Sequence, residues 1–349
     1  MKTERLTAAD VERAAEILRR GGPAGHPHET VYGLGANGLD EEAVARIFAA
    51  KGRPQDNPLI LHIPSADWLE RYCEAVPAAY TLAERFWPGP LTMILARKPA
   101  VPDAVTAGLD TVGMRCPAHP CAGPSSPPPG CRWRPPSGNT SGRPSPTSMA
   151  DMLEDMEGKI DGIVDGGPCA VGVESTILDL TEQPPRLLRP GGVTLEELRA
   201  VLGEVAVDPA VTRLMGAGGA PPGPGSEVPP LRPQGPRHRG EGGSAAATAA
   251  YIQARLKAGE GVVCFDEFAG LYAGHQVERL GPADDKAAQA RNVFDALRAF
   301  DGTGVTAIWS QCPDEAGLGL AVSNRLGKAA GFHIIDLTGS RRRSGENGV

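Results

Sequence analysis

A segment rich in Gly, Pro, Arg and Ser, residues 216–243, divides this 349-residue chain into two parts in which helical and strand patterns alternate. Gly and Pro interrupt regular secondary structure, so such a segment is typical of a linker. A chain of this length also favours two hydrophobic cores over one. We therefore expect a catalytic domain over 1–205, a linker over 206–244, a second domain over 245–338 and a disordered tail over 339–349.

The alternation of helices and strands predicts the fold class. The run TAADVERAAEILRRGG has Thr7 as an N-cap, Asp10 three residues later and glycine at its end, which predicts a helix. Short apolar runs such as PLILHIP and PLTMILAR predict buried strands. The first part is therefore expected to be α/β or α+β, and the second a smaller doubly wound, Rossmann-like α/β domain.

Composition narrows the class of protein. The net charge is -7, so the surface as a whole is not expected to attract nucleic acid, and an RNA role would need a local basic patch or a partner. The seven cysteines are odd in number and form no CxxC pair, and the N-terminus has no apolar signal core. No stretch approaches the roughly 18 apolar residues of a membrane span. These features predict a reduced, cytoplasmic protein without a membrane segment.

The segment KGRPQDNPLILH predicts an anion-binding turn. Lys51 and Arg53 flank a glycine at the end of a predicted helix, and Pro54 and Pro58 stiffen the residues that follow. Two cations held by Gly and Pro can clamp a polyphosphate. Cations at a helix C-terminus also complement the helix dipole, so a purely structural role stays open. His62, on the next apolar strand, fits a ligand contact or an ordinary core histidine equally.

Further polar side chains stand beside glycines or at the ends of predicted strands. HETVYGLGAN places a hydroxyl before a glycine turn, where backbone can approach a ligand closely. TVGMR carries two polar residues four positions apart, on one face of a strand. PSGNTSGRPSPT clusters hydroxyls, although this composition is also that of an ordinary turn. The candidates are Thr30, Asn57, Thr111, Arg115, Ser137, Ser175 and Arg189.

Two common catalytic motifs are missing from the sequence. It has neither the G-x-S-x-G elbow of serine hydrolases nor the GxxxxGK[ST] phosphate-binding loop. Several cations and hydroxyls without a nucleophile and base pair indicate a site that binds anions and orients substrates without a covalent intermediate. ATP remains a possible substrate, because side chains alone can form a phosphate clamp.

Seven motifs in this order resemble the YrdC-type L-threonylcarbamoyladenylate synthases: HETVYGLGAN, KGRPQDNPLILHI, FWPGPLT, TVGMRCPAHP, SGNTSGRPSPT, GVESTILDL and LLRPGG. They cover residues 1 to about 200, and FDALRAFDGTGV with GLGLAVSNRLGKAA resembles the C-terminal domain of the longer members. The resemblance implies a twisted, mixed α/β sheet with a large concave site.

The resemblance also implies an activity. Such an enzyme is a nucleotidyltransferase that converts L-threonine, bicarbonate (or carbon dioxide) and ATP, with Mg²⁺ accompanying the ATP, into threonylcarbamoyl-AMP and pyrophosphate. Partner proteins would then transfer the threonylcarbamoyl group to an adenosine beside the anticodon of tRNA.

The resemblance assigns roles to the candidate residues. L-threonine would be held by Thr30, His62, Arg115 and Ser175. ATP would be held by Lys51, Arg53, Asn57, Thr111, Ser137 and Arg189. Lys51 and Arg53 are the expected catalytic cations, because they can stabilise charge on the pyrophosphate leaving group. No metal ligand from the protein is expected, since Mg²⁺ would bridge phosphates.

The chain departs from the family pattern in three places. GGPAGH and PHETVYG replace an apolar strand and PTETVYG, which puts His28 and the first strand in doubt. Residues 121–136 are rich in proline where a buried strand is expected, and proline cannot donate ladder hydrogen bonds. Residues 227–239, EVPPLRPQGPRHR, stand where the family has a Lys-Tyr-Arg-His-Tyr-Ala-Pro linker motif. When these residues are back-translated with permitted codons and one base is dropped, that motif is recovered.

We therefore interpret the segments 121–136 and 227–239 as frameshifted, and propose no zinc site from Cys121 and Cys131. A chain with this sequence is expected to be impaired relative to a frame-restored version. Resequencing the DNA and comparing threonine-dependent pyrophosphate release of the two versions test this hypothesis.

Three alternatives to the synthase differ from it in the sequence features that they require. A double-stranded RNA-binding or ribosome-assembly module of the same fold needs a basic groove, which the acidic balance disfavours. An inactive, frameshifted copy of the synthase is a further alternative. Carbamoyl transfer as in hydrogenase maturation requires acylphosphatase and zinc-finger segments that the sequence lacks. The joint presence of Lys51, Arg53, Asn57, His62 and Ser175 favours the synthase.

Overall fold

The computed structural model describes residues 2–38, 40–52, 57–119, 137–211, 237–241, 244–331 and 334–337. The frameshift hypothesis falls mainly on residues outside these ranges, namely 121–136 and 227–236, and the tail predicted over 339–349 also lies outside them. These predictions are therefore not addressed by the structure.

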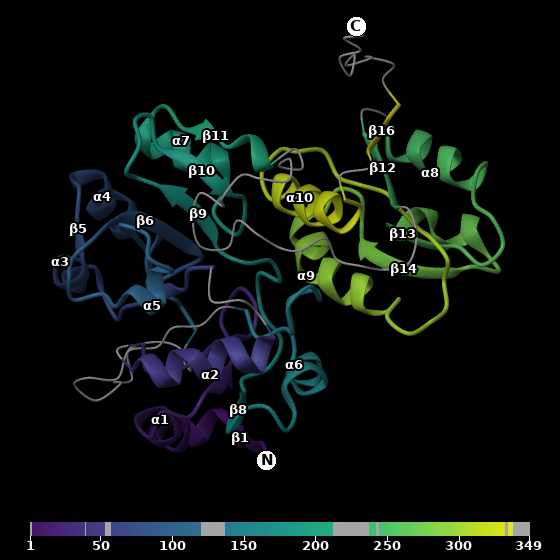
Figure 1. Ribbon diagram of the computed structural model, residues 1–349. Helices are drawn as coiled ribbons and strands as arrows, with labels where there is room; N and C mark the ends of the chain where they lie inside the picture. The colour runs from purple at the N-terminus through teal and green to yellow at the C-terminus, as the bar shows by residue number, and fades with distance from the viewer. Residues whose placement is uncertain are drawn as a thin grey trace, which may run out of the picture.

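The first part of the chain forms two mixed sheets (Figure 1). The smaller has the order β1 (Glu4–Thr7), β8 (Gly162–Asp165), β2 (Ala24–His26) and β3 (Gly33–Gly35). The larger has the order β11 (Ala206–Val207), β10 (Arg186–Arg189), β9 (Thr176–Asp179), β6 (Leu91–Arg97), β7 (Thr111–Arg115) and β4 (Ile60–His62), with β5 (Cys73–Glu74) paired to β6.

Helices cover these two sheets. The longer ones are α1 (Val11–Arg19), α2 (Glu41–Lys51), α4 (Pro77–Phe86), α6 (Met149–Met156) and α7 (Leu195–Leu202). The short ones are α3 (Leu69–Tyr72), α5 (Asp103–Thr106) and the 3₁₀ turns η1 (Ala8–Asp10), η2 (Ala66–Trp68) and η3 (Pro209–Val211). The N-terminal helix signal is confirmed, because Thr7 and Asp10 form the expected capping box, although the first turn after it is 3₁₀.

The segment GGPAGH forms a strand despite its composition. β2 pairs in parallel with β8 and antiparallel with β3. At Gly25 a Cβ would lie 2.6 Å from Cε of Met152 on α6, so a side chain here would require Met152 to shift. The glycine therefore allows this strand to pack closely against α6.

The second part of the chain forms an all-parallel sheet of five strands. Its order is β14 (Gln276–Gly281), β13 (Gly261–Phe265), β15 (Ile308–Ser310), β12 (Arg237–Glu241) and β16 (Ile334–Asp336). The accompanying helices are α8 (Ala245–Gln253), α9 (Lys286–Arg298), α10 (Gly319–Ala329) and the 3₁₀ turn η4 (Asp266–Tyr272). The predicted α/β class, with a mixed first part and a smaller Rossmann-like second part, is confirmed.

Strands also occur within 206–244, the range predicted as a linker. β11 pairs with β10 of the larger sheet, and β12 lies between β15 and β16. The sequence RHRGE of β12 has no alternation of apolar and polar residues, so it does not predict a strand. Its pairing is made by backbone groups, which any non-proline residue supplies.

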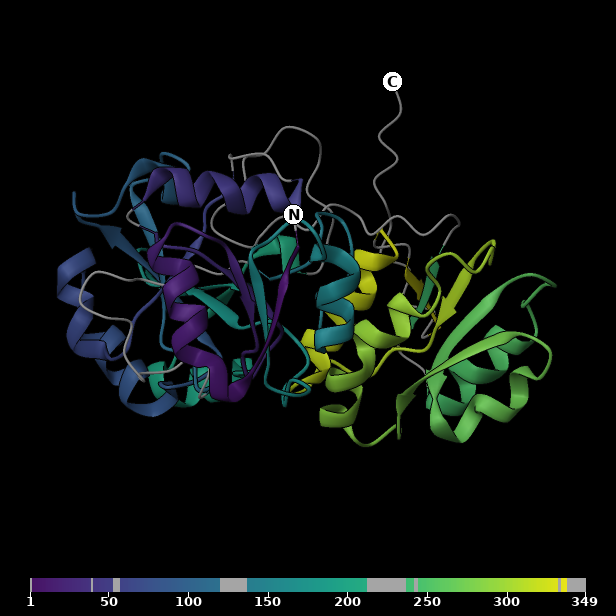
Figure 2. The ribbon, with the colours of Figure 1, turned by 90° about the horizontal axis from the view of Figure 1, so that it is seen from below.

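The two parts of the chain meet along α6, α9 and α10, while α8 lies on the far side of the second part (Figures 1 and 2). An apolar cluster crosses the boundary, since Val31 and Val173 pack with Phe294 and Val322. Gly172 approaches α9 so closely that a Cβ would lie 2.3 Å from Cα of Arg291. The boundary is therefore tightly packed at this point.

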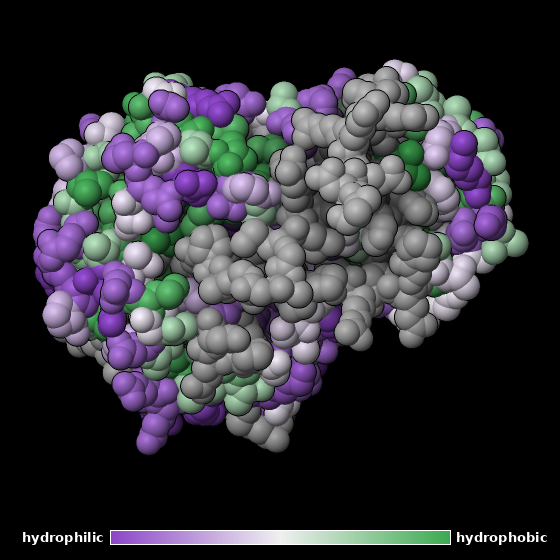
Figure 3. Space-filling view, turned by 45° about the horizontal axis from the view of Figure 1, so that its top comes forward, coloured by the Kyte–Doolittle hydropathy of each residue, from purple (hydrophilic) through white to green (hydrophobic). Residues whose placement is uncertain are grey.

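The surface of the described residues is mixed. On the face shown in Figure 3, hydrophilic and hydrophobic side chains are interspersed over the first part of the chain. None of the helices that the structure describes is long and apolar enough to span a membrane.

Candidate functional site

Four strands of the larger sheet bring polar side chains to one edge of the sheet, the edge at which β4 and β7 end and β6 and β9 begin. β4 and β7 run parallel and pair His62 with Arg115 at their C-terminal ends. β6 runs antiparallel to β7, so its second residue, Thr92, pairs with Arg115. β9 runs parallel to β6, and Ser175 immediately precedes its first residue. Residues far apart in the sequence therefore meet where these strands end or begin.

Arg115 is the cation at this edge. Its side chain is 5% exposed, and its Nη2 donates to Oε1 of Glu29 at 2.6 Å and to Oγ1 of Thr30 at 3.0 Å. Its Nε donates to the carbonyl of Gly89 at 3.3 Å. A guanidinium fixed in this way by neighbours on two sides is oriented to bind a carboxylate through its remaining donors.

Ser175 belongs to a buried hydroxyl network. Its Oγ lies 2.8 Å from Oγ1 of Thr92 and accepts a hydrogen bond from Nη2 of Arg189 at 3.1 Å. Arg189, at the end of β10, also donates from Nε to the carbonyl of Ser175 at 3.0 Å. The guanidinium of Arg189 is thus fixed against the start of β9, next to the residues around Arg115.

Three buried histidines lie beside Arg115. His28 Nε2 is 2.9 Å from His26 Nε2, and the ring of His28 is 4.9 Å from that of His62. Burial lowers the pKa of His62 well below its usual range, and Arg115 lowers it further. Burial likewise lowers the pKa of His26 to about 3. These imidazoles are therefore neutral at pH 7, which keeps the positive charge of the site on Arg115.

His62 and Asn57 each have a buried polar atom, Nδ1 of His62 and Oδ1 of Asn57, that finds no hydrogen-bond partner among the residues that the structure describes. Such orphaned groups cost free energy unless a ligand or water satisfies them. Both residues were predicted from the sequence as ligand contacts. Their free atoms are consistent with that prediction.

Lys51 joins the end of α2 to the segment around Ser137. Its ammonium donates to the carbonyl of Ser137 and, at 2.6 Å, to the carbonyl of Asn139. Ser137 Oγ donates to Oδ1 of Asn139 at 2.6 Å. At Gly138 a Cβ would lie 2.2 Å from Sδ of Met152, so a larger residue here would require Met152 to shift. The turn predicted from PSGNTSG is therefore held against both α2 and α6.

Two predicted site residues lie toward the opposite ends of β7 and β4 from Arg115 and His62. Thr111 is the first residue of β7 and Arg115 the last, so a strand rise of ~3.3 Å per residue separates them by roughly 13 Å. Asn57 also precedes its strand, β4, whose far end carries His62. Arg53 lies outside the described residues.

The structure also reveals polar residues that sequence reasoning missed. Glu29 pairs with Arg115, and Thr92 contacts Ser175. Glu174 accepts from Ser145 at 2.8 Å and from Nε of Arg325, on α10, at 2.6 Å. The signal for Glu29 and Glu174 was their position next to Thr30 and Ser175, whereas Thr92 is identifiable only from strand pairing.

Two family models and two full-length relatives match the chain. The family model described as "Telomere recombination" matches residues 16–191, and the model described as "Threonylcarbamoyl-AMP synthase, C-terminal domain" matches residues 193–331. A threonylcarbamoyl-AMP synthase of Pyrococcus abyssi is 45% identical, over 95% of this chain and 97% of the relative. One of Bacillus subtilis is 42% identical, over 95% and 97%.

A solved structure shows the same architecture over the whole chain. Sua5 of P. abyssi, crystallised in complex with L-threonine, superposes with a TM-score of 0.84 at 42% identity, and covers 97% of this chain and 100% of that one. Both parts of the chain and nearly the full length of these relatives are thus matched. The chain therefore belongs to the threonylcarbamoyl-AMP synthase family, in the form that carries the additional C-terminal domain.

Proposed function

We propose that the edge formed by β4, β6, β7 and β9 is the L-threonine site of this threonylcarbamoyl-AMP synthase. The observation that supports it most is the buried guanidinium of Arg115, which is fixed by Glu29 and Thr30 and is the cation available for the threonine carboxylate. Thr30, His62 and Ser175 surround it with hydroxyls and a neutral imidazole, which suit the hydroxyl and amine of threonine. Glu29 supplies the negative charge that an ammonium group prefers.

ATP would lie beside this pocket. The proposed contacts come from Lys51, Ser137 and Arg189, whose groups surround the turn after α2 and the start of β9. Asn57 offers an unpartnered amide oxygen, and Arg53 and Thr111 remain contacts that only the family resemblance supports. The cations would neutralise the phosphates, as a polyphosphate site requires.

The proposed reaction links the substrates bound at the two sites. The threonine amine adds to carbon dioxide derived from bicarbonate, forming a C–N bond and releasing a proton. A carbamate oxygen then attacks the α-phosphorus of ATP, and the bond from this phosphorus to the bridging oxygen breaks, releasing pyrophosphate. The protein residues hold the two substrates in line and balance the charge on the leaving group.

Mg²⁺ would reach the site with ATP. Among the residues that the structure describes, no three His, Cys, Asp or Glu groups cluster to hold a metal ion. The metal would be held by the phosphates, which is common for nucleotide-dependent enzymes. Bound in that way, it supplies positive charge to the phosphoryl oxygens.

The product carries an activated acyl group. We propose that tRNA-modifying transfer proteins in the cytoplasm consume it, because a mixed anhydride with AMP is suited to acyl transfer and short-lived in water. A role with double-stranded RNA remains a prediction of the fold resemblance only.

Calorimetric titration tests the proposed substrates. L-threonine and ATP with Mg²⁺ are each expected to bind the protein, and both together with bicarbonate are expected to release pyrophosphate. Serine and GTP are suitable comparison ligands, because serine lacks only the methyl group of threonine and GTP differs from ATP only in the base, at C2 and C6. A protein that binds neither threonine nor ATP would refute the assignment of the site.

Lys51→Met is expected to lower kcat/KM for ATP about 30-fold, which corresponds to about 2 kcal/mol. The change removes a buried cation and leaves the carbonyls of Ser137 and Asn139 without its ammonium donor. Lys98→Met is the matched control, because Lys98 pairs with Glu70 at the surface. Pyrophosphate release at varied ATP concentration measures the effect, and equal loss in both variants would argue against a role for Lys51.

A further inference from the structure

The residues from Ser137 to Pro144 form a turn with an internal scaffold, which we call the 137–144 loop. Asn139 Nδ2 donates to the carbonyls of Thr140, at 3.0 Å, and of Arg143, at 2.9 Å. Lys51 holds the start of the loop, as described above, and the amide of Ser141 donates to the carbonyl of Lys51 at 2.9 Å. The loop thus contains Ser137 and is bound to Lys51, two of the residues proposed to contact ATP.

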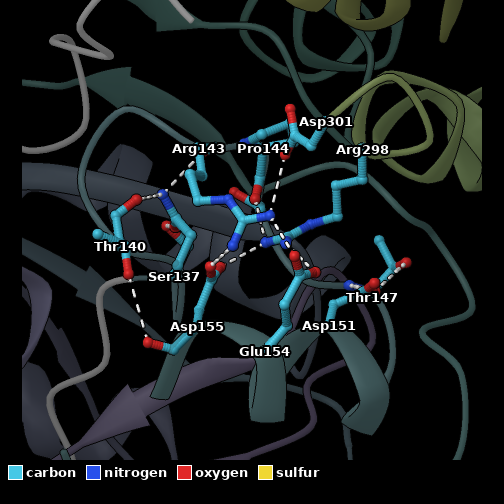
Figure 4. Close-up of polar contacts among 12 residues, drawn as sticks. Ser137, Thr140, Arg143, Pro144, Thr147, Asp151, Glu154, Asp155, Arg298 and Asp301 are labelled. Atoms are coloured by element: carbon cyan, nitrogen blue, oxygen red, sulfur yellow. Dashed lines mark hydrogen bonds and ion pairs between the residues drawn. The ribbon is translucent and has the colours of Figure 1, made fainter. Parts of the chain in front are cut away.

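Arg143 anchors the far end of this loop to acidic side chains. Its guanidinium donates to Oδ1 of Asp155, to Oε1 of Glu154 at 2.6 Å and to Oδ2 of Asp301 at 2.9 Å (Figure 4). Asp155 and Glu154 lie on α6, whereas Asp301 follows α9 in the second part of the chain. The loop is therefore tied to both parts of the protein at once.

Asp155 shares its carboxylate between two arginines. Its side chain is fully buried, and while Oδ1 accepts from Arg143, Oδ2 accepts from Nη2 of Arg298 at 2.6 Å. The same Nη2 of Arg298 donates to the carbonyl of Pro144 at 2.6 Å (Figure 4). Arg298, the last residue of α9, thus contacts the end of the loop directly and its anchor on α6.

Burial makes these contacts energetically significant. The side chain of Arg298 is 5% exposed and that of Asp155 is 0% exposed. Removing one partner of such a pair leaves a charge buried without its counter-ion, which costs far more than the loss of an exposed ion pair. Without Arg298, the carbonyl of Pro144 loses its donor, and Asp155 loses one of its two arginine partners and keeps only Arg143.

Two more contacts join the same region to the second part of the chain. Thr147 Oγ1 donates to Oδ1 of Asp295 on α9 at 2.5 Å. Ser145 donates to Glu174, which pairs with Arg325 on α10. Two residues that follow Pro144 are therefore held, directly or through Glu174, by helices of the second part.

We propose that Arg298 is a positioning residue, through which the second part of the chain holds the 137–144 loop in the conformation that binds ATP. The proposal rests on the ATP contact assigned above to Ser137. In this role Arg298 makes the C-terminal domain contribute to nucleotide binding through the 137–144 loop, without itself touching the nucleotide.

Binding constants for ATP with Mg²⁺ and for L-threonine, measured separately by calorimetry, test this role. Arg298→Met is expected to raise the Kd for ATP at least tenfold and to change that for threonine less than twofold. Arg298→Lys is expected to recover most of the affinity, because an ammonium can reach both Pro144 and Asp155. Lys286→Met, at the other end of α9, is the matched control, since Lys286 pairs with Asp314 within the second part.

A second variant covers the case in which Arg298→Met does not fold. Asp301→Asn weakens only an exposed contact of Arg143, so the protein is expected to fold and to bind ATP twofold to threefold more weakly. If Arg298→Met does not fold, unchanged ATP affinity in Asp301→Asn would leave these contacts a purely structural role and overturn the proposal. Equal losses of ATP and threonine affinity in a folded Arg298→Met would do the same.

Ser137→Ala separates this inference from the proposed function. If it leaves ATP affinity unchanged, the assignment of Ser137 fails and the positioning role fails with it. If it weakens ATP binding while Arg298→Met does not, only the positioning role is wrong. Weaker ATP binding in Ser137→Ala and in Arg298→Met, with threonine binding retained, supports both the ATP assignment of Ser137 and the positioning role of Arg298.

Discussion

Arg115→Met is expected to raise the KM for L-threonine at least 100-fold, which corresponds to about 3 kcal/mol. The change removes the proposed partner of the threonine carboxylate and leaves Glu29 buried without its counter-ion. A charge-assisted contact in a buried site is worth more than one at the surface, and an unpaired carboxylate of Glu29 would repel the carboxylate of the substrate as well. Initial rates of pyrophosphate release at varied threonine concentration and saturating ATP measure the effect.

The control for this experiment lies on the neighbouring strand of the same sheet. Arg97→Met removes the ion pair of Arg97 with Asp103, whose side chain is 75% exposed, and is expected to leave the KM for threonine unchanged. Arg115→Lys is expected to be intermediate, because lysine keeps the charge but lacks the paired donors of guanidinium. A threonine KM within threefold of the original in Arg115→Met would exclude Arg115 as the carboxylate partner.

The sequence alone selected most of the residues of the proposed site. Their motifs end or begin predicted strands, and a strand end is a place where side chains reach a site instead of a core. Pairing of the strands, however, is a long-range property. That Thr92 would meet Ser175 follows from the pairing of β6 with β9 and not from spacing along the chain.

The contacts between the two parts of the chain were beyond sequence reasoning. Arg298 and Arg325 occupy helices whose patterns predict only amphipathic packing, and charged residues of this kind are ordinarily expected at the surface. Their burial depends on carboxylates more than 100 residues away, at Asp155 and Glu174. Likewise β12 lacks any apolar pattern and is recognisable as a strand only from its backbone partners.

Glu174 is the most strongly perturbed carboxylate at this boundary. Burial alone would raise its pKa, but Arg325, Arg189 and the hydroxyl of Ser145 outweigh this and lower the pKa to about 2, from an ordinary value of 4.5. Because the folded-state pKa lies below the unfolded one, the folded protein binds fewer protons, and ionised Glu174 stabilises it fully above about pH 4.5. That contribution decreases as the pH falls from about 4.5 to 2.

Glu174→Gln is expected to destabilise the protein by about 3 kcal/mol at pH 7, because Arg325 is left buried without its carboxylate. Glu182→Gln, which removes an exposed pair with Arg186, is the control and is expected to change the melting temperature little. The difference in melting temperature between the original protein and Glu174→Gln should shrink as the pH falls from 5 toward 3, since the original carboxylate then begins to protonate. A constant difference over that range would contradict ionisation of Glu174 as the source of the stability.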